Sequence, residues 1–222
     1  RTYAFKILYK SISTLFLLPK PGGTHMYFVI SLDTPIRQGQ KPYPHLVLNF
    51  AKADVFDKDE PLMLKMDKKE IEDKYKDKNL KRKMDGPVFE VVAKVFRALT
   101  GRKLIGAGKF SNYSSDKAIK CSYKAFEGCL FFLEKSIFFL HKPTIYVRHE
   151  EIKSFKFQRA DTSRAGGSRF FDLAVMLKAG GKPHIFSNII KEEYEGLVSF
   201  IEQKGLTIEK QPNASPNSDA ME

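Results

Sequence analysis

The sequence of 222 residues contains no tryptophan, two cysteines and five scattered histidines. Two cysteines cannot build the disulfide framework of a small secreted domain, so we expect Cys121 and Cys129 to be reduced and packed in the core. The histidines form no short-spaced set of zinc ligands, and we predict neither a metal nor a cofactor. No run approaches the roughly 20 apolar residues that a membrane-spanning helix needs. These absences argue against a metalloprotein, a disulfide-rich secreted domain and a membrane-spanning protein.

Catalytic motifs are also lacking. Gly101 and Gly106 have the glycine spacing of a phosphate-binding loop, but Ala107 stands where that loop needs lysine. There is no Gly-x-Ser-x-Gly motif for a serine nucleophile. Cys121 lies in the middle of an alternating segment, where a cysteine is more often part of the core than a nucleophile. We therefore predict that the protein is not an enzyme.

Positive charge is abundant, because 38 Lys and Arg residues outweigh 26 Asp and Glu residues and give a net charge of +12. Such an excess favours polyanions, which include nucleic acids, anionic membranes and acidic protein segments. Charge alone does not choose among these partners.

The second half of the chain reads as a series of short strands closed by one helix. Its aromatic and β-branched runs are separated by Gly, Pro and charged residues, which is typical of a small antiparallel sheet or barrel. The helix is expected over residues 191–204, where Tyr194, Leu197 and Ile201 share one apolar face, and Gly205 supplies a stop. The predicted strands are residues 118–124, 128–133, 136–141, 144–148, 154–158, 170–177 and 184–187.

The first half repeats this plan. A polar loop bracketed by prolines is expected over residues 35–42, and residues 67–85 alternate in charge sign, with Asp67 as the cap of a short exposed helix. That charged segment is either a contact surface or a solvated helix and linker. A firmer helix begins at Pro87 and ends at Thr100 and Gly101. The predicted strands of this half are residues 3–7, 15–18, 26–32, 45–50 and 61–66.

Two sets of strands with a closing helix predict two tandem domains, in an α+β fold that is mainly β. We place the first domain at residues 1–103, the second at residues 104–208 and a disordered tail at residues 209–222. In the second domain, a long loop presents Arg159, Arg164 and Arg169 among small residues. Guanidinium groups on such a loop suit phosphates or carboxylates, although an ordinary solvated hairpin loop explains them as well.

Several segments resemble, in order and spacing, the middle region of the small, structure-specific-recognition subunit of the FACT histone chaperone. The resemblance covers nearly the whole chain except its tail. The segments are IRQGQ at residues 36–40, LTGRK at 99–103, CSYKA at 121–125, FLHKP at 139–143, SRFFD at 168–172 and KEEY at 191–194.

This resemblance implies tandem pleckstrin-homology-like barrels, each closed by a C-terminal helix, with the first domain continuing upstream of Arg1. It implies a non-catalytic module of a nucleosome-reorganising complex that is nuclear and associated with chromatin during transcription, DNA replication and DNA repair. Its implied partners are core histones, DNA and replication proteins, with the large FACT subunit bound through regions outside this chain.

The resemblance also selects a surface. The family pattern matches well at Arg37, Gln38, Gln40 and Lys41, and we expect these residues to contact a histone or another partner. The alternative interpretation is that Gly39 and its neighbours make a tight turn and have no further role. The arginine loop ends as in the family but inserts residues 165–167, which departs from the family pattern.

Electrostatics limit how a basic module binds basic histones. Histone binding requires a local acidic or apolar patch, for which residues 54–60 and the pair Glu150 and Glu151 are candidates. DNA binding is expected to be weak and salt-dependent. The alternative is a phosphoinositide-binding domain, in which Lys120 and Lys124 flank the first hairpin of a barrel.

Overall fold

The computed structural model describes residues 4–160 and 168–209, and the chain divides into two compact units. Unit 1 comprises residues 1–118 with residues 131–134, and unit 2 comprises residues 119–130 with residues 135–222. Within the described residues, no helix is long and apolar enough to cross a membrane. The predicted fold class, α+β and mainly β, is confirmed.

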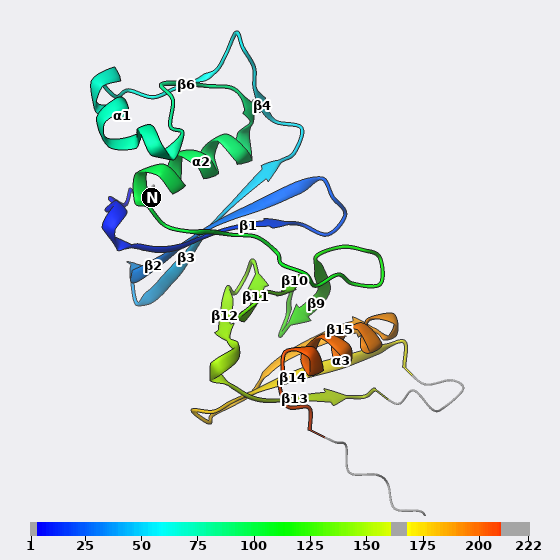
Figure 1. The fold of residues 1–222 in the computed structure, drawn as a ribbon. Helices are drawn as coiled ribbons and strands as arrows, with labels where there is room; N and C mark the ends of the chain where they lie inside the picture. Colours follow the sequence, from blue (N-terminus) through cyan, green and yellow to red (C-terminus); the bar gives the residue numbers. More distant parts are fainter. Residues whose placement is uncertain (1–3, 161–167, 210–222) are drawn as a thin grey trace, which may run out of the picture. The chain divides into compact units, whose positions relative to one another are not determined.

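Unit 1 contains a four-stranded sheet in the order β3-β2-β1-β8 (Figure 1). The three long strands pair antiparallel, and β8 lies parallel to β1 through the pairs Leu15 with Leu104 and Phe16 with Ile105. The short strand β8 therefore covers the edge of β1. The sequence analysis assigns residues 104 and 105 to the second domain, but their pairing puts them in the sheet of unit 1. The elements are η1 (Tyr9–Ser11), β1 (Ile12–Pro19), β2 (His25–Gln38), β3 (Lys41–Ala51) and β8 (Leu104–Ile105).

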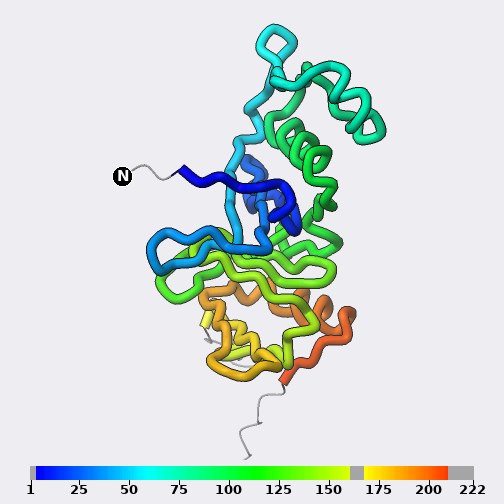
Figure 2. Tube along the Cα trace, turned by 90° about the vertical axis from the view of Figure 1, so that its left-hand side faces the viewer, coloured from blue at the N-terminus to red at the C-terminus, as the bar shows by residue number. Residues whose placement is uncertain are grey.

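Helix α2 (Val88–Thr100) packs against this sheet, as Figures 1 and 2 show. Ala93 enters the same buried cluster as Leu15 and Phe28, and the ring of Phe96 meets that of Phe28 at a centroid distance of 5.4 Å. Gly101 ends the helix in the left-handed conformation, with φ of 67°, and its N–H donates to the carbonyl of Arg97. This confirms the predicted stop, because glycine adopts that conformation without strain.

Two short ribbons and helix α1 form an outer lobe that extends away from the sheet of unit 1 in both views (Figures 1 and 2). Leu80 and Met84 pack against Val91 and Val95 of α2. Asp67 occupies the N-cap position of α1, but its side chain makes no capping hydrogen bond. The strand predicted at residues 61–66 is too long, because only β5 pairs there. The lobe consists of β4 (Val55–Phe56), β5 (Leu62–Met63), α1 (Lys68–Tyr75), η2 (Lys76–Lys78), β6 (Lys83–Met84) and β7 (Gly86–Pro87).

Unit 2 is built on a seven-stranded sheet in the order β12-β11-β10-β9-β15-β14-β13. Every strand predicted for this half is present, with ends that differ by a few residues. The elements are β9 (Ala118–Tyr123), β10 (Phe126–Phe132), β11 (Ser136–Leu140), β12 (Ile145–Arg148), η3 (His149–Glu151), β13 (Ile152–Gln158), β14 (Phe170–Leu177), β15 (His184–Ile190), η4 (Lys191–Glu193) and α3 (Tyr194–Gln203).

Aromatic rings fill the core of unit 2. The ring of Phe186 lies 5.5 Å from that of Tyr123 and 5.6 Å from that of Phe139, measured between centroids. Tyr194 of α3 packs edge-on against Phe157 at 4.8 Å, which ties the closing helix to the sheet. Such tilted and edge-on pairs add to the free energy gained from burial alone. Figure 1 shows α3 lying against β14 and β13.

The chain segment after α3 returns to the edge strand β13. Ile208 forms a parallel bridge with Phe155, the N–H of Glu209 donates to the carbonyl of Phe155 at 2.7 Å, and the hydroxyl of Ser154 donates to the Glu209 carboxylate at 2.6 Å. The predicted start of the disordered tail is therefore wrong at Glu209, because this residue satisfies backbone groups on the edge of the sheet. The rest of the predicted tail, residues 210–222, lies outside the described residues.

Candidate functional site

The four residues expected to contact a partner in unit 1 lie together at the tip of the β2–β3 hairpin. Arg37, Gln38, Gln40 and Lys41 are exposed, and Gln38 pairs directly with Lys41 across the two strands. The connection is the two-residue turn Gly39-Gln40, in which Gly39 has φ of 61°. The ammonium of Lys41 lies over the Tyr43 ring, 5.4 Å from its centroid, which orients the side chain along the hairpin.

The prediction of a polar loop over residues 35–42 is wrong, because most of these residues belong to the two strands of this hairpin. Pairing continues through Ile36 with Tyr43 and Arg37 with Pro42, so only two residues are outside the strands. Pro42 does not interrupt the sheet, because β3 is its edge strand and Pro42 needs no second partner. Pro35 lies in β2 between Ser31 and Ile36, where the register with β3 shifts. Gly39 therefore makes the tight turn that one reading proposed. The contact role of the hairpin tip stays a prediction.

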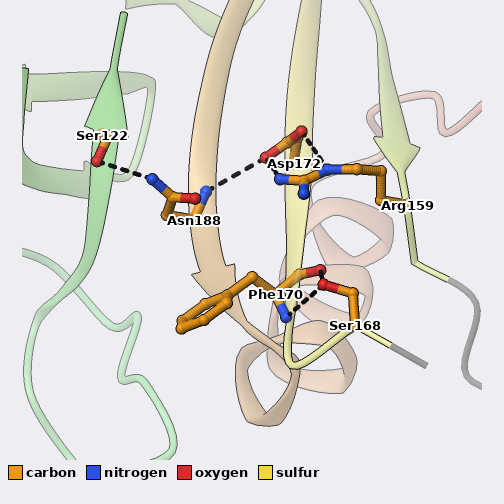
Figure 3. Close-up of polar contacts among 6 residues, drawn as sticks. All are labelled: Ser122, Arg159, Ser168, Phe170, Asp172 and Asn188. Carbon is orange, nitrogen blue, oxygen red and sulfur yellow. Dashed lines mark hydrogen bonds and ion pairs between the residues drawn. The ribbon is translucent and has the colours of Figure 1, made fainter. Parts of the chain in front are cut away.

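The arginine loop of unit 2 begins at Arg159, whose side chain is bonded to a residue of the same unit. Arg159 donates from Nε to Asp172 Oδ2 at 2.8 Å and from Nη2 to Asp172 Oδ1 at 2.6 Å (Figure 3). This two-point ion pair joins the end of β13 to β14. Arg169 is exposed, and its carbonyl accepts a hydrogen bond from the Lys191 N–H at 3.1 Å. Arg164 lies outside the described residues.

Asp172 is the centre of a polar network that crosses the outer face of the sheet. Besides Arg159, it accepts the N–H of Asn188 at 3.2 Å, and the Asn188 amide donates to the Ser122 hydroxyl at 3.3 Å (Figure 3). Burial raises the pKa of Asp172, but the hydrogen bonds from Arg159 and Asn188 outweigh it and hold that pKa below its ordinary value. The carboxylate is therefore charged and fully engaged at neutral pH.

Sequence reasoning missed Ser122 and Asn188 in this network. Asn188 has φ of 60°, a left-handed conformation that asparagine tolerates better than most residues. The polar pair Ser187 and Asn188 between apolar strand residues is the one signal that the sequence offered. Ser168 and Phe170 hydrogen-bond to each other beside the network (Figure 3), and the Phe170 side chain is partly exposed.

Four acidic residues in the outer lobe of unit 1 form a surface that we call the acidic lobe. They are Asp54, Asp57, Asp59 and Glu60. All four carboxylates are on exposed residues. Asp57 Oδ1 accepts the N–H groups of Asp59 and Glu60, which closes a tight turn. The carboxylates of Asp59 and Glu60 take no part in those two bonds. Two large apolar side chains accompany them, since Val55 is 59% exposed and Met63 is 54% exposed. Lys58 lies among these acids, and the Lys83 ammonium donates to its carbonyl at 3.0 Å, so the lobe combines an excess of carboxylates with apolar surface and two cations.

The second acidic candidate is different, because its charges are already paired. Arg148 reaches Glu150 at 2.9 Å and Glu151 at 3.4 Å. The hydrogen bond from the Arg148 N–H is the main reason that the pKa of Glu151 lies below its ordinary value. A cationic partner would have to displace Arg148, so the acidic lobe of unit 1 is the better candidate surface for a basic protein.

The arrangement offers little for catalysis. Cys121 and Cys129 form no disulfide and are buried, and burial raises the pKa of the Cys121 thiol, so it is not a thiolate nucleophile. In the described ranges, no three His, Cys, Asp or Glu residues gather in a group that could hold a metal ion.

Two known families match successive parts of the chain, one for each of its two large sheets. Residues 1–104 match the family described as the SSRP1 PH domain. Residues 117–210 match the family described as the middle domain of Rttp106-like histone chaperones. The tandem pleckstrin-homology-like architecture is consistent with both matches.

Curated relatives match the chain over almost its full length. It is 43% identical over 208 residues to FACT complex subunit Ssrp1 of Drosophila melanogaster, 42% identical over 208 residues to FACT complex subunit pob3 of Schizosaccharomyces pombe, and 40% identical over 208 residues to FACT complex subunit SSRP1 of Xenopus laevis. Each alignment covers 94% of this chain but only 27%, 39% and 29%, respectively, of the relative. The chain thus spans well under half the length of these relatives.

Proposed function

Because the chain belongs to the family of SSRP1-like PH and Rttp106-like middle domains found in FACT complex subunits, we propose that it is a non-catalytic histone-chaperone module of a nucleosome-reorganising complex. The observation that carries this proposal is the ordered pair of family matches over both sheets. We place the module in the nucleus, on chromatin, acting in transcription, replication and repair. Replication proteins are further partners, and the large FACT subunit binds through regions outside this chain.

The acidic lobe supplies what histone binding requires. A protein with a net charge of +12 does not attract basic histones at long range, so recognition depends on a local surface of opposite charge. Asp59 and Glu60 are exposed, and Val55, which is four residues before Asp59 in the sequence, is exposed as well. Carboxylates provide charge complementarity to histone Lys and Arg, and the apolar side chains provide contacts that salt does not screen.

DNA is the second partner of this proposal, and it is bound by the remaining positive charge. Contacts between Lys or Arg and phosphates release counterions, so DNA affinity falls steeply as the salt concentration rises. Histone binding that rests partly on apolar contacts falls less steeply. The two partners therefore differ in their salt dependence.

A phosphoinositide-binding role is the second candidate. Lys124 and Lys142 lie at the β9–β10 side of unit 2, and the Lys142 ammonium is 5.6 Å from the centroid of the Phe126 ring, a side chain that is 43% exposed. Two cations beside an exposed aromatic ring suit an anionic membrane surface. Lys120 is also exposed. Binding to phosphoinositide liposomes, without saturable histone binding, would favour this role.

The test is a titration with purified core histones, followed by fluorescence anisotropy at low and physiological salt. We expect saturable binding at physiological salt that weakens about fivefold to tenfold in Asp59→Asn/Glu60→Gln, because two exposed charge pairs are lost. The matched control is Glu150→Gln/Glu151→Gln, which removes the same charge from side chains already paired with Arg148.

We expect that control variant to change affinity less than about twofold. An Arg37→Ala/Gln38→Ala variant measures the contribution of the hairpin tip in the same assay. If the parent binds no histone at physiological salt and binds only DNA at low salt, the chaperone proposal is wrong for this part of the protein.

A further inference from the structure

A basic pocket lies at the C-terminal end of α2, at the opposite end of that helix from the acidic lobe. The backbone ties the acidic lobe to the helix start, where the Val88 N–H donates to the Asp54 carbonyl at 3.0 Å. The pocket has a volume of about 620 Å³, and all its walls belong to unit 1. A helix of 13 residues separates the two features by roughly 20 Å.

Three elements build the walls of the pocket. Lys94 and Arg97 come from the last turns of α2, and Arg102 and Lys103 follow the left-handed turn at Gly101. Lys103 directly precedes β8, whose pairing with β1 holds the chain there. The third wall is η2. The four cations are therefore carried by segments of defined backbone and not by a loose loop.

The cations of the pocket outnumber its acids. Its charged lining consists of Lys78, Lys94, Arg97, Arg102 and Lys103 against the single acid Asp77. Lys78 is already used, because it donates to the Ala98 carbonyl at 3.2 Å and its ammonium lies 5.5 Å from the centroid of the Tyr75 ring. Among residues 4–160 and 168–209, the other four cations form no ion pair with a carboxylate. An anionic occupant would relieve the repulsion among them.

The helix dipole accounts for only part of this charge. The C-terminus of a helix carries the equivalent of about half a negative charge, which one or two cations such as Lys78 and Arg97 complement. Arg102 and Lys103 lie beyond the helix end, where they add positive charge in excess of that. The remaining excess favours binding of an external anion.

The lining also distinguishes among anions. It contains no aromatic side chain, so it offers no stacking surface for unpaired bases. Duplex DNA presents a convex surface that touches the rim of a pocket of this size but does not fill it. Only Ala98 and Leu104 are apolar, whereas pockets for drug-sized molecules are mostly apolar. An extended peptide rich in Asp and Glu is thin enough to enter, and its carboxylates accept paired hydrogen bonds from Arg.

We propose that the basic pocket formed by Lys94, Arg97, Arg102 and Lys103 is a docking site for an acidic peptide segment of a partner protein. This site is separate from the acidic lobe and carries the opposite charge. The module would therefore bind a basic protein at one end of α2 and an acidic protein segment at the other. The two activities are separable by mutation.

The test measures the binding of a short fluorescein-labelled peptide of alternating Asp and Glu residues by anisotropy at physiological salt. The pocket variant is Arg97→Gln/Lys103→Gln. The matched control is Lys153→Gln/Lys182→Gln, which removes the same charge from two exposed positions of unit 2. Melting temperatures of both variants check that each remains folded, and a short duplex DNA is titrated in parallel.

We expect the pocket variant to bind the peptide at least about fivefold more weakly and the control variant to change less than about twofold, because only the pocket positions contact it. Equal losses in both variants would show that the overall charge is responsible and would overturn the proposal. It is overturned as well if the parent does not bind the peptide, or if the pocket variant loses DNA binding while peptide binding is unchanged.

Discussion

The charged side chains of the two units have different partners. In unit 2, Arg159 pairs with Asp172 across two strands, and Arg148 pairs with both Glu150 and Glu151. In unit 1, the ion pairs run along the surface of α1, from Lys68 to Glu72 and from Glu70 to Lys74. Within the described ranges, neither the acidic lobe nor the free cations of the basic pocket take part in an ion pair.

This difference separates charges that support the fold from charges available for binding. A carboxylate that accepts three hydrogen bonds from its own unit has little capacity left for a partner. An exposed carboxylate or cation without such bonds contributes little to stability, but it contributes to recognition. Unit 1 is accordingly the better place to look for charge-dependent partners, and the predictions below measure how far the two units differ.

The largest expected effect lies beneath the charged surface of unit 2. A Cβ atom added at Gly128 would meet the carbonyl oxygen of Leu140 and the ring of Phe139, and neither can move without shifting the sheet. We expect Gly128→Ala to lower the free energy of unfolding by about 3 kcal/mol. Chemical denaturation followed by circular dichroism measures the change.

Gly196→Ala in α3 is the matched control, because a Cβ there meets nothing within 4 Å. Since alanine is the better helix former, we expect a gain of up to about 1 kcal/mol. Equal effects of the two substitutions would contradict the tight packing of β10 against β11.

The next largest effect tests the charge comparison directly. Asp172→Ala removes the acceptor of Arg159 and of the Asn188 N–H, and we expect it to lower the free energy of unfolding by about 2 kcal/mol. Asp54→Ala in unit 1 makes the same chemical change at an exposed site, and we expect less than about 0.5 kcal/mol. If both variants lose the same stability in chemical denaturation, the two surfaces do not differ as described.

The smallest expected effect is a dependence of the free energy of unfolding on pH. It arises from His45 in unit 1. The Nδ1 of His45 lies 2.7 Å from the Ser31 hydroxyl, and burial lowers the pKa of His45 from 6.5 to about 4. The fold therefore favours the neutral ring, so this contribution is present above pH 6.5 and is lost as the pH falls from 6.5 through about 4. After allowance for partial solvent screening, we expect a loss of about 1 kcal/mol.

Free energies of unfolding measured across that window check this expectation. A His45→Asn variant should reduce the dependence between pH 6.5 and 4 without abolishing it, because burial also lowers the pKa of His184 in unit 2, and His25→Gln on the same sheet as His45 should leave it unchanged. Asp172 acts in a lower window, because a depressed carboxyl pKa contributes stability that is lost only as the pH falls below about 3.8. A His45→Asn variant that retains the full slope would argue against a buried neutral ring.

The predicted strands and helices were largely correct because their residues follow clear periods, except that residues 4–7 of the strand predicted at 3–7 form no strand. The apolar run of residues 26–32 lies entirely within β2 and is buried, and the apolar face of α2 faces the cores of unit 1. The error at residues 35–42 has a tertiary cause. The sequence predicts a polar loop bracketed by prolines there, yet Pro42 lies on an edge strand where its missing N–H is tolerated.

The candidate sites were less accessible to sequence reasoning. The hairpin tip from Arg37 to Lys41 was found because its residues are adjacent in the chain. The basic pocket was not, because it joins residues near 78, 97 and 103 that meet only after α2 has packed. Its LTGRK segment was noticed as part of a resemblance and as a failed phosphate loop, and neither observation located the cavity.

The sequence by itself determined the mainly β fold, the two closing helices, the absence of a catalytic motif and the excess of positive charge, because these depend on local period and composition. Tertiary structure alone decided which charges are free. Arg159 and Lys103 are both basic residues in polar segments, but strand pairing puts a carboxylate beside the first and a cavity beside the second. Ion pairing depends on distances of a few ångströms between residues far apart in the chain, and only the folded chain sets those distances.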